Sequence, residues 1–311
     1  MHGGATRSFF EPTPLNASPR RAVHFTCPSC GTELHEVDSV KLVCENGHAF
    51  DIAREGHVHL LPPARKRVTL SDESVRQSRA FFEGGGFAEQ IDGVAAEVVR
   101  ALLHCPPVAG VGAQVLAVGC GEGIYLRAVE KALSAAGGTP PIAGLWGIDA
   151  SKLSVRYAAR RQPGACFAVA SPHHLPFADG TLDLVFSVFA PAPWAELCRV
   201  LRPGGAVIVA RGGFDHLRSL YALAGADALA APRAPKQFTA GLAENYARIR
   251  SKESFRGEMA ASLLAMTPFV QRAPTSVRER LYSLPELTTT VDVIMSTHRV
   301  WLGTGGGRFE L

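Results

Sequence analysis

The sequence predicts an α/β fold, in which an open and mostly parallel sheet carries helices on both faces and follows a small metal-binding domain. From Gln114 onward, short apolar strands alternate with glycine turns and amphipathic helices, a pattern that builds a parallel sheet covered on both sides. Three cysteines and a histidine stand close together near the N-terminus. The length of 311 residues exceeds one typical domain, so we expect one large core and a small accessory unit.

Composition excludes few classes of protein. The formal charge of +4 mildly favours acidic partners such as nucleic acid. The longest apolar runs are interrupted well short of the length that spans a bilayer, and no apolar signal-peptide region follows the first residues. We therefore expect neither a membrane span nor a secretory signal.

The first residues form a basic leader. Residues 1–24 contain Arg7, Arg20 and Arg21 against Glu11. This composition fits an organellar transit peptide, and it fits a disordered tail equally well. The compartment is therefore open between the cytoplasm and the mitochondrion.

The next motif is typical of a zinc site. Its candidate ligands form a C-x2-C pair and a C-x3-H pair, namely Cys27, Cys30, Cys44 and His48. Four protein ligands in a tetrahedron leave no position for water, so we expect a structural site. Gly31 and Gly47 supply tight turns, and residues 33–44 between the pairs alternate like a hairpin. The alternative is four unrelated residues. We interpret the other cysteines as buried apolar side chains: Cys105, Cys120, Cys166 and Cys198.

The core domain follows element by element from the same alternation. A strand over 114–118, a glycine turn over 119–123 and a helix over 124–136 form the first unit. A strand, a helix, two strands, a helix, a turn and a strand then follow over 145–149, 151–161, 166–170, 182–189, 194–201, 202–205 and 206–211. Ligands in such sheets bind at the carboxyl ends of the strands, near the point where the strand order reverses.

The glycine turn and the acid after the next strand predict a nucleoside cofactor. Gly119, Gly121 and Gly123 form G-x-G-x-G, which differs from the dinucleotide pattern G-x-G-x-x-G. The glycines let the backbone approach a bulky ligand, and Asp149 ends the next strand, where a carboxylate can accept both hydroxyls of a ribose. The alternatives are a tight strand-to-helix turn and an N-cap for the helix over 151–161.

The regions flanking this core are less informative. Residues 76–79 and 84–86 predict a helix and a hinge that lead into the core. The basic stretch over 64–67 is interpreted either as a phosphate-binding patch or as a solvated linker. Residues 238–269 look helical, and residues 287–303 look like paired closing strands of the sheet.

The motifs VLAVGCGEG, GIDASK and LRPGG resemble those of class I S-adenosylmethionine (SAM)-dependent methyltransferases. From about Phe25 onward the chain also resembles the zinc-containing guanine-N1 methyltransferases of large-subunit ribosomal RNA, the rRNA methyltransferase A and tylosin-resistance type. This narrower resemblance includes CPSC…CENGHAFDIAREGHVHLLP, RQSRAFFEGGGF, FDHLRSL and LLAMTPF. It implies a Rossmann-like class I methyltransferase core with a zinc ribbon. The implied segments are a leader (1–24), a zinc-binding domain (25–65), a helical connector (66–110), a SAM-binding methyltransferase domain (111–303) and a flexible tail (304–311).

The resemblance also implies roles for individual residues. The four zinc-ligand candidates match the zinc ligands of the family. The implied cofactor-binding residues are Phe87, Gly119, Gly121, Gly123, Ile124, Asp149, Ala170, Ser171 and His216. The chain departs from the family pattern at Phe87, where a tyrosine is usual, and at Ala117, where an aspartate is common. It also lacks a Trp-Arg pair after LLAMTPF, where residues 270–272 read VQR.

The activity implied by the resemblance is methyl transfer from SAM to N1 of a guanine in large-subunit ribosomal RNA. The implied partner is a ribosomal RNA hairpin. N1 of a paired guanine is hidden, so the base must lie in a loop or be flipped out. A homodimer is a further possibility. Phe189 ends the strand where related enzymes hold the target base, unless its ring packs in the core. Asp183 is interpreted as a structural loop residue, and no general base is identified. The alternatives are a small-molecule methyltransferase with a zinc ribbon and an RNA-binding relative that has lost catalysis.

Overall fold

The computed structural model describes residues 25–61, 71–104, 112–138, 140–223, 243–267 and 275–300. Several sequence predictions lie outside these residues: the leader over 1–24, the basic stretch over 64–67, Cys105, residues 270–272 and the tail over 304–311. Within the described segments, no helix combines the length and the apolar character needed to cross a membrane.

The N-terminal module is a small antiparallel sheet. Its strands β1 (Leu34–Val37), β2 (Lys41–Cys44) and β3 (Ala49–Asp51) are hydrogen-bonded in the order β1-β2-β3, which confirms the predicted hairpin. Phe25 is buried against Phe177 of the large domain, with the ring centroids 5.3 Å apart. The core of the module is therefore continuous with the core of the large domain.

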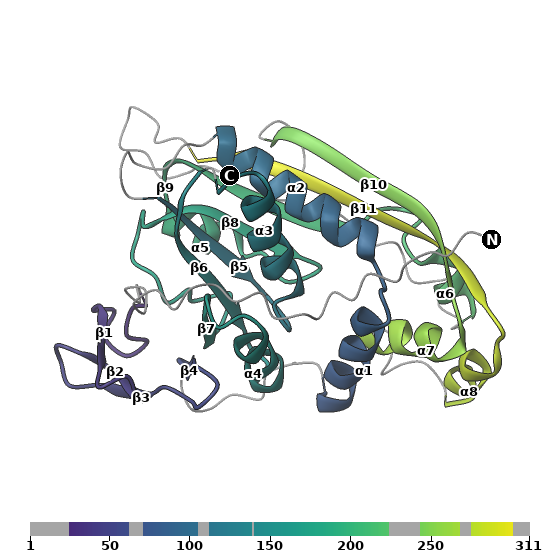
Figure 1. Cartoon of the computed structure of the whole chain (residues 1–311), viewed down its shortest axis with the longest axis horizontal. Helices are drawn as coiled ribbons and strands as arrows, with labels where there is room; N and C mark the ends of the chain where they lie inside the picture. The colour runs from purple at the N-terminus through teal and green to yellow at the C-terminus, as the bar shows by residue number, and fades with distance from the viewer. Residues whose placement is uncertain are drawn as a thin grey trace.

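The large sheet contains eight strands in the order β10-β11-β9-β8-β5-β6-β7-β4 (Figure 1). Its strands are β4 (His57–His59), β5 (Ala113–Val118), β6 (Ile142–Asp149), β7 (Cys166–Val169), β8 (Leu182–Val188), β9 (Leu201–Gly212), β10 (Ala243–Phe255) and β11 (Leu287–Arg299). All neighbours from β4 to β9 are parallel, and β11 runs antiparallel to both β9 and β10. The predicted, mostly parallel sheet is thus confirmed, and β4 extends it from the N-terminal module.

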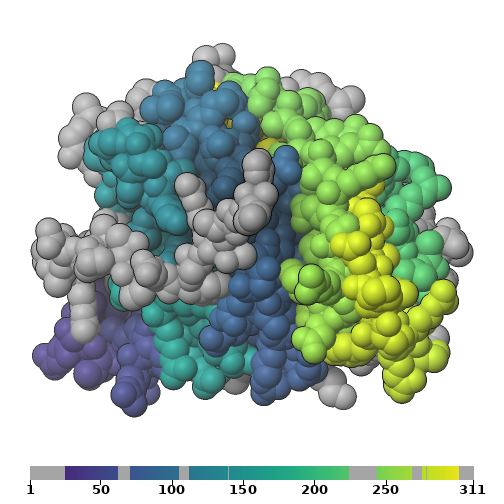
Figure 2. Space-filling view, turned by 45° about the vertical axis from the view of Figure 1, so that its right-hand side comes forward, coloured from purple at the N-terminus to yellow at the C-terminus, as the bar shows by residue number. Residues whose placement is uncertain are grey.

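Helices cover both faces of this sheet. They are α1 (Asp72–Glu83), α2 (Ala88–His104), α3 (Ile124–Ala135), α4 (Lys152–Arg161), α5 (Trp194–Val200), α6 (Arg218–Leu223), α7 (Gly257–Met266) and α8 (Thr275–Ser283). Apolar residues of α2, α3 and α4 form one core with the sheet, α5 and the N-terminal module form a second, and α1, α6, α7 and α8 form a third with β11. Figure 2 shows α1 and α2, in blue, between the teal core and the green β10 and α7.

The C-terminal third corrects two predictions. Residues 243–255 form strand β10, whereas we expected a helix from 238 to 269; among the residues of that range that the structure describes, only α7 is helical. Residues 287–299 form the single strand β11, which pairs with β9 and β10 and not with itself. The Ala, Glu, Arg and Lys residues of β10 favour a helix intrinsically, but pairing with β11 overrides that preference. In addition, the predicted turn over 202–205 belongs to β9.

Candidate metal and cofactor sites

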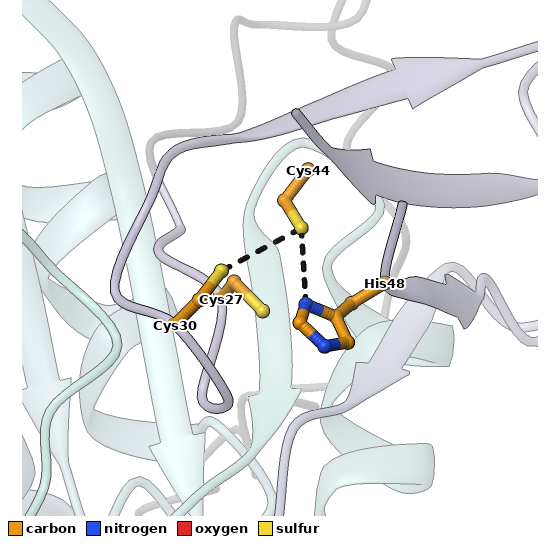
Figure 3. Close-up of side chains that lie close together, drawn as sticks. All are labelled: Cys27, Cys30, Cys44 and His48. Carbon is orange, nitrogen blue, oxygen red and sulfur yellow. Dashed lines mark hydrogen bonds between the residues drawn. The ribbon is translucent and has the colours of Figure 1, made fainter. Parts of the chain in front are cut away.

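The four predicted zinc ligands converge in the N-terminal module (Figure 3). Their ligand atoms all lie within 4.8 Å of one another. Each pair is closed by a glycine with positive φ: Gly31 (+76°) donates to the carbonyl of Cys27, and Gly47 (+80°) donates to the carbonyl of Cys44. Only residues without a Cβ adopt this conformation at low cost, so the glycines fold each pair into a tight turn.

The spacing of these ligands fits tetrahedral zinc. The Sγ atoms of Cys30 and Cys44 are 3.7 Å apart, and Cys44 Sγ lies 3.4 Å from His48 Nδ1. A tetrahedron with Zn–S bonds of about 2.3 Å has S···S edges of about 3.8 Å, close to the first distance. Hydrogen bonds from Asn46 and Thr32 lower the pKa of Cys30 to about 5, which favours the thiolate that a metal requires. Burial raises the pKa of Cys27, whose proton a bound metal would displace.

The glycine turn lies where the strand order reverses. Residues 119–123 follow β5. From β5 the chain adds β6 and β7 on one side of that strand and then returns to add β8 and β9 on the other side. Gly119, Gly121 and Gly123 have φ values of +67°, +53° and +78°, and Ile124 begins α3 directly after them. A Cβ added at Gly121 would meet no atom within 4 Å, so the backbone there is open to a ligand. This is the position at which open α/β sheets bind ligands.

Two of these glycines should respond very differently to alanine. A Cβ at Gly119 would lie 2.3 Å from Cβ of Ala190. A Cβ at Gly121 would touch no atom within 4 Å, so its cost is only that of a positive φ for a residue with a side chain. We expect Gly119→Ala to lower the free energy of unfolding by about 2–4 kcal/mol and Gly121→Ala by about 1 kcal/mol. Urea denaturation of the two variants measures the difference. Equal losses would contradict the close approach of the two loops.

Asp149 lies at the end of β6 beside the glycine turn. Its Oδ2 accepts from the backbone N–H of Gly121 at 3.0 Å, and its Oδ1 accepts from the N–H of Ser151 at 2.8 Å. The N-cap of α4 is Ser151, whose Oγ accepts from Ser154, so the alternative in which Asp149 caps this helix is wrong. Burial raises the pKa of Asp149, and the backbone bonds oppose that rise. The carboxylate is thus held in a fixed orientation.

Ala170 and Ser171 continue this edge of the sheet. Ala170 follows β7, is buried, and donates its N–H to the carbonyl of Asp149 at 3.0 Å. Ser171 begins a local turn, in which its Oγ accepts from the N–H of His173. The structure therefore places both residues next to Asp149, and their predicted contact with a cofactor stays a prediction.

An aromatic cluster forms the other side of the site. The rings of Phe189 and His216 are stacked with centroids 5.1 Å apart, and Phe87 lies 6.1 Å from His216 and 6.5 Å from Phe189. Phe87 and Phe189 both have positive φ, at 60° and 52°, which is uncommon for bulky residues. Phe87 is buried, but Phe189 is 43% exposed, so the interpretation of Phe189 as a core residue is wrong.

The histidine of this cluster is neutral at ordinary pH. Burial lowers the pKa of His216 to about 4. Its Nδ1 accepts from the backbone N–H of Asp292 at 3.3 Å, so the ring proton resides on Nε2. His216 therefore offers a hydrogen-bond donor at Nε2 and is a poor proton acceptor. The side-chain bond of His216 thus joins it to the distant strand β11 and not to the start of the neighbouring helix α6.

Sequence reasoning missed an ion-pair network beneath the glycine turn. Arg161 at the end of α4 donates to Glu122 of the turn at 2.7 Å and to Glu83 at the end of α1 at 2.6 Å. Burial raises the pKa of Glu122 to about 7, although the neighbouring Arg161 acts in the opposite direction. These residues are far apart in sequence and carry no shared spacing, so no local pattern could have linked them.

Two further residues from the sequence analysis have structural positions. Asp183 lies within β8 at the opposite end of the sheet, where it accepts from the N–H of Gln114 and from Arg202. It is therefore structural, as predicted, although it lies in a strand and not in a loop. Ala117 is buried in the core beneath α2 and α3.

Comparison with known proteins identifies the family. Residues 25–69 match the zinc-ribbon model described as "RlmA, N-terminal", and residues 116–209 match a methyltransferase domain. The 23S rRNA (guanine(748)-N(1))-methyltransferase of Streptomyces fradiae is 32% identical over 284 residues, covering 86% of this chain and 94% of its own length. The chain belongs to the 23S rRNA (guanine-N1)-methyltransferase family.

Other members of this family support the same assignment. A protein of Bacillus subtilis that is provisionally named for the same activity, YxjB, is 31% identical over 281 residues, covering 86% of this chain and 94% of its own. Another, from Micromonospora griseorubida, is 36% identical over 208 residues, covering 63% of this chain and 68% of its own. As a member of this family, the chain is a SAM-dependent methyltransferase with a structural zinc ribbon.

Proposed function

We propose that this chain transfers a methyl group from SAM to N1 of a guanine in large-subunit ribosomal RNA. The observation that carries the proposal is the similarity to the Streptomyces fradiae enzyme along 94% of that enzyme's length, in a chain that has both a zinc ribbon and a methyltransferase domain. A small-molecule methyltransferase would have no evident use for the first of these modules. Retention of both modules supports an RNA substrate.

The residues around the glycine turn fit the cofactor. The open backbone at Gly121 can approach its methionine part, and the fixed carboxylate of Asp149 can accept from both ribose hydroxyls. We assign the adenine edge to Ala170 and Ser171, which lie beside Asp149. When bound, SAM supplies an electrophilic methyl group on a sulfonium. The protein has to orient the nucleophile in line with that group and exclude water.

The stacked pair of Phe189 and His216 is a suitable platform for the target base. Phe189 follows β8 and is exposed, and its loop touches the glycine turn through Ala190. Aromatic rings bind a flipped base by stacking. Guanine N1 must lose its proton to become a nucleophile, and negative charge then gathers on O6. His216 cannot take the proton, because its pKa is about 4 and its Nδ1 is bonded; its Nε2–H could donate to a carbonyl oxygen or to the cofactor.

Replacing the stacking ring should impair RNA methylation selectively. We expect Phe189→Ala to lower kcat/KM for RNA by about 10- to 100-fold, because stacking is worth about 1–3 kcal/mol per base. The SAM dissociation constant should stay within about twofold, since no cofactor contact is assigned to this ring. Methylation kinetics and calorimetry measure the two effects. The control is Tyr282→Ala, which removes an exposed ring of α8 and should change neither kcat/KM nor the SAM dissociation constant.

Mass-spectrometric mapping of methylated guanines tests the proposal as a whole. Large-subunit RNA lacking the modification is incubated with the purified protein and SAM, and one N1-methylguanine should appear. An unchanged map, despite SAM binding by calorimetry, would contradict RNA methylation and favour a small-molecule substrate. Failure to bind SAM would instead indicate a relative that has lost catalysis. The hairpin form of the substrate and a homodimer stay predictions, which truncated RNA substrates and sedimentation equilibrium would test.

A further inference from the structure

The edge strand β10 carries a row of basic and aromatic side chains on one face. Exposed and half-buried residues alternate along the strand, as expected for a strand with one covered face. The exposed residues run from Glu244 to Ser254, and the central four, Tyr246, Arg248, Arg250 and Lys252, are what we call the outer face of β10. The guanidinium side chains of Arg248 and Arg250 are 49% and 52% exposed. Figure 1 shows β10 at the edge of the sheet opposite the N-terminal module.

The other face of β10 is covered by α2. A Cβ added at Gly93 would lie 2.1 Å from Ile249, and Gln90 donates to Ser251 at 2.8 Å. Asn245 donates to the buried Glu97 at 3.1 Å. Because successive side chains point to opposite faces of a strand, the basic row points away from α2. It therefore lies on the same face of the sheet as α5 and the zinc module.

The basic row continues across the sheet to the proposed target-base platform. Arg248 pairs with Ile294 of β11, and Ile294 pairs with Arg211 of β9, so the three residues share one face. Arg211 follows Ala210, whose carbonyl accepts from the N–H of Phe189 at 3.0 Å. Arg248 and Arg211 thus lie on one face of the sheet, and Arg211 adjoins the residue whose backbone bonds to Phe189.

Two carboxylates, the buried Asp292 and the half-buried Asp215, hold two of these arginines in place. Arg248 donates to the two oxygens of Asp292 at 2.7 and 2.9 Å through Nε and Nη2, and the Asp292 side chain is fully buried. Arg250 donates to Asp215. A guanidinium has five N–H donors, so such bonds leave donors for a second anion while they fix the side chain. The other cations are Arg211, Lys252 and Arg218; Arg218 also pairs with Asp215 at 3.7 Å and lies over the ring of Phe214.

Charged residues on an edge strand can also serve simply to prevent pairing with another chain. Charges of alternating sign would do that equally well. Here the charges of the outer face and of Arg211 and Arg218 have one sign, and the nearby acids Asp215 and Asp292 neutralise only part of it. Glu244 at the start of the strand is paired with Arg299. The excess of positive charge beside a site for a polyanionic substrate calls for a different explanation.

We propose that the outer face of β10, together with Arg211 and Arg218, binds the phosphate backbone of the RNA whose guanine reaches Phe189. This inference rests on the proposed function and adds to it the surface that holds the RNA. Fixed guanidinium groups suit phosphate oxygens, and the exposed Tyr246 and Phe214 can contact ribose or bases. The surface carries no base-specific readout, so it positions RNA and does not select its sequence.

The test uses a variant that removes cations without stranding a buried acid. Arg211→Gln, Arg218→Gln and Lys252→Gln are combined, and Arg248 and Arg250 are kept because Asp292 and Asp215 need them. The control variant combines Arg76→Gln, Lys131→Gln and Arg280→Gln, exposed basic residues of α1, α3 and α8, and has the same net charge. Filter binding to deproteinised bacterial 23S rRNA is measured for both over a series of KCl concentrations. Methyl transfer to the same RNA and SAM binding are measured in parallel.

The outer-face variant should bind RNA at least about tenfold more weakly than the control variant at moderate salt. Its slope of log affinity against log salt should be smaller by about two, because each lost phosphate contact removes about 0.7–0.9. SAM binding should be unchanged in both. Equal RNA affinities and slopes for the two variants would overturn the proposal and leave the face to a protein partner, and methylation by the wild type would then still stand. If the outer-face variant shows the smaller salt dependence of RNA affinity but the wild type methylates no RNA, the surface would be supported and the proposed function contradicted.

Discussion

Asp149→Ala should weaken SAM binding by at least about 100-fold and abolish measurable methyl transfer. In our assignment the carboxylate accepts from both ribose hydroxyls, and charge-assisted hydrogen bonds are worth about 1.5–3 kcal/mol each. Isothermal titration calorimetry measures the loss. Asp179→Ala removes an exposed carboxylate that pairs with Arg199 on the surface, and it should leave SAM affinity unchanged.

The same residue predicts how affinity depends on pH. Burial raises the pKa of Asp149 above its ordinary value of 3.8, and the ionised form is the one that accepts both hydroxyls. Affinity should therefore be complete above the raised pKa and fall as the pH drops through it. Asp149→Asn should remove this dependence. Asp149→Asn offers one acceptor oxygen where the carboxylate uses two, so it should lower the free energy of unfolding by about 1–3 kcal/mol, even though burial disfavours the charge. Unchanged SAM affinity in either variant would refute the cofactor assignment.

Loss of zinc should have the second large effect. Cys44→Ser removes the ligand that contacts both Cys30 and His48, and the variant should lose its bound zinc. Structural zinc contributes about 10–16 kcal/mol in isolated zinc-finger peptides, so we expect the free energy of unfolding to fall by at least about 5 kcal/mol. The loss should reach the large domain, because Phe25 packs on Phe177 and β4 pairs with β7. RNA methylation should be lost with it.

Metal analysis by mass spectrometry and thermal denaturation measure these effects. Cys198→Ser is the matched control, because this half-buried cysteine of α5 lies outside the ligand cluster. It should retain one zinc ion per chain and destabilise the protein only slightly. A Cys44→Ser protein with wild-type zinc content and stability would show that the cluster does not bind the metal.

Local patterns were sufficient for the convergence of the four zinc-ligand candidates and for the edge of the sheet that carries the glycine turn and Asp149. Cys27 and Cys30, like Cys44 and His48, lie within a few residues of each other, so spacing alone brings each pair together. Asp149 and Gly121 end adjacent parallel strands, which meet at one edge of a sheet whatever the details of packing. Strand β10 could not be recognised in this way. Its residues favour a helix, and only the open edge of β11 makes a strand more stable.

By itself the sequence determined the parallel core, the zinc cluster and the glycine turn with its acid, since each depends on residues close in the chain or on strand alternation. The tertiary structure alone decided that His216 stacks on Phe189, that Arg161 joins the glycine turn to α1, and that Arg211 and Arg248 share a face. These contacts join distant segments, and their geometry depends on how the whole sheet and its helices pack. No short-range pattern records such packing.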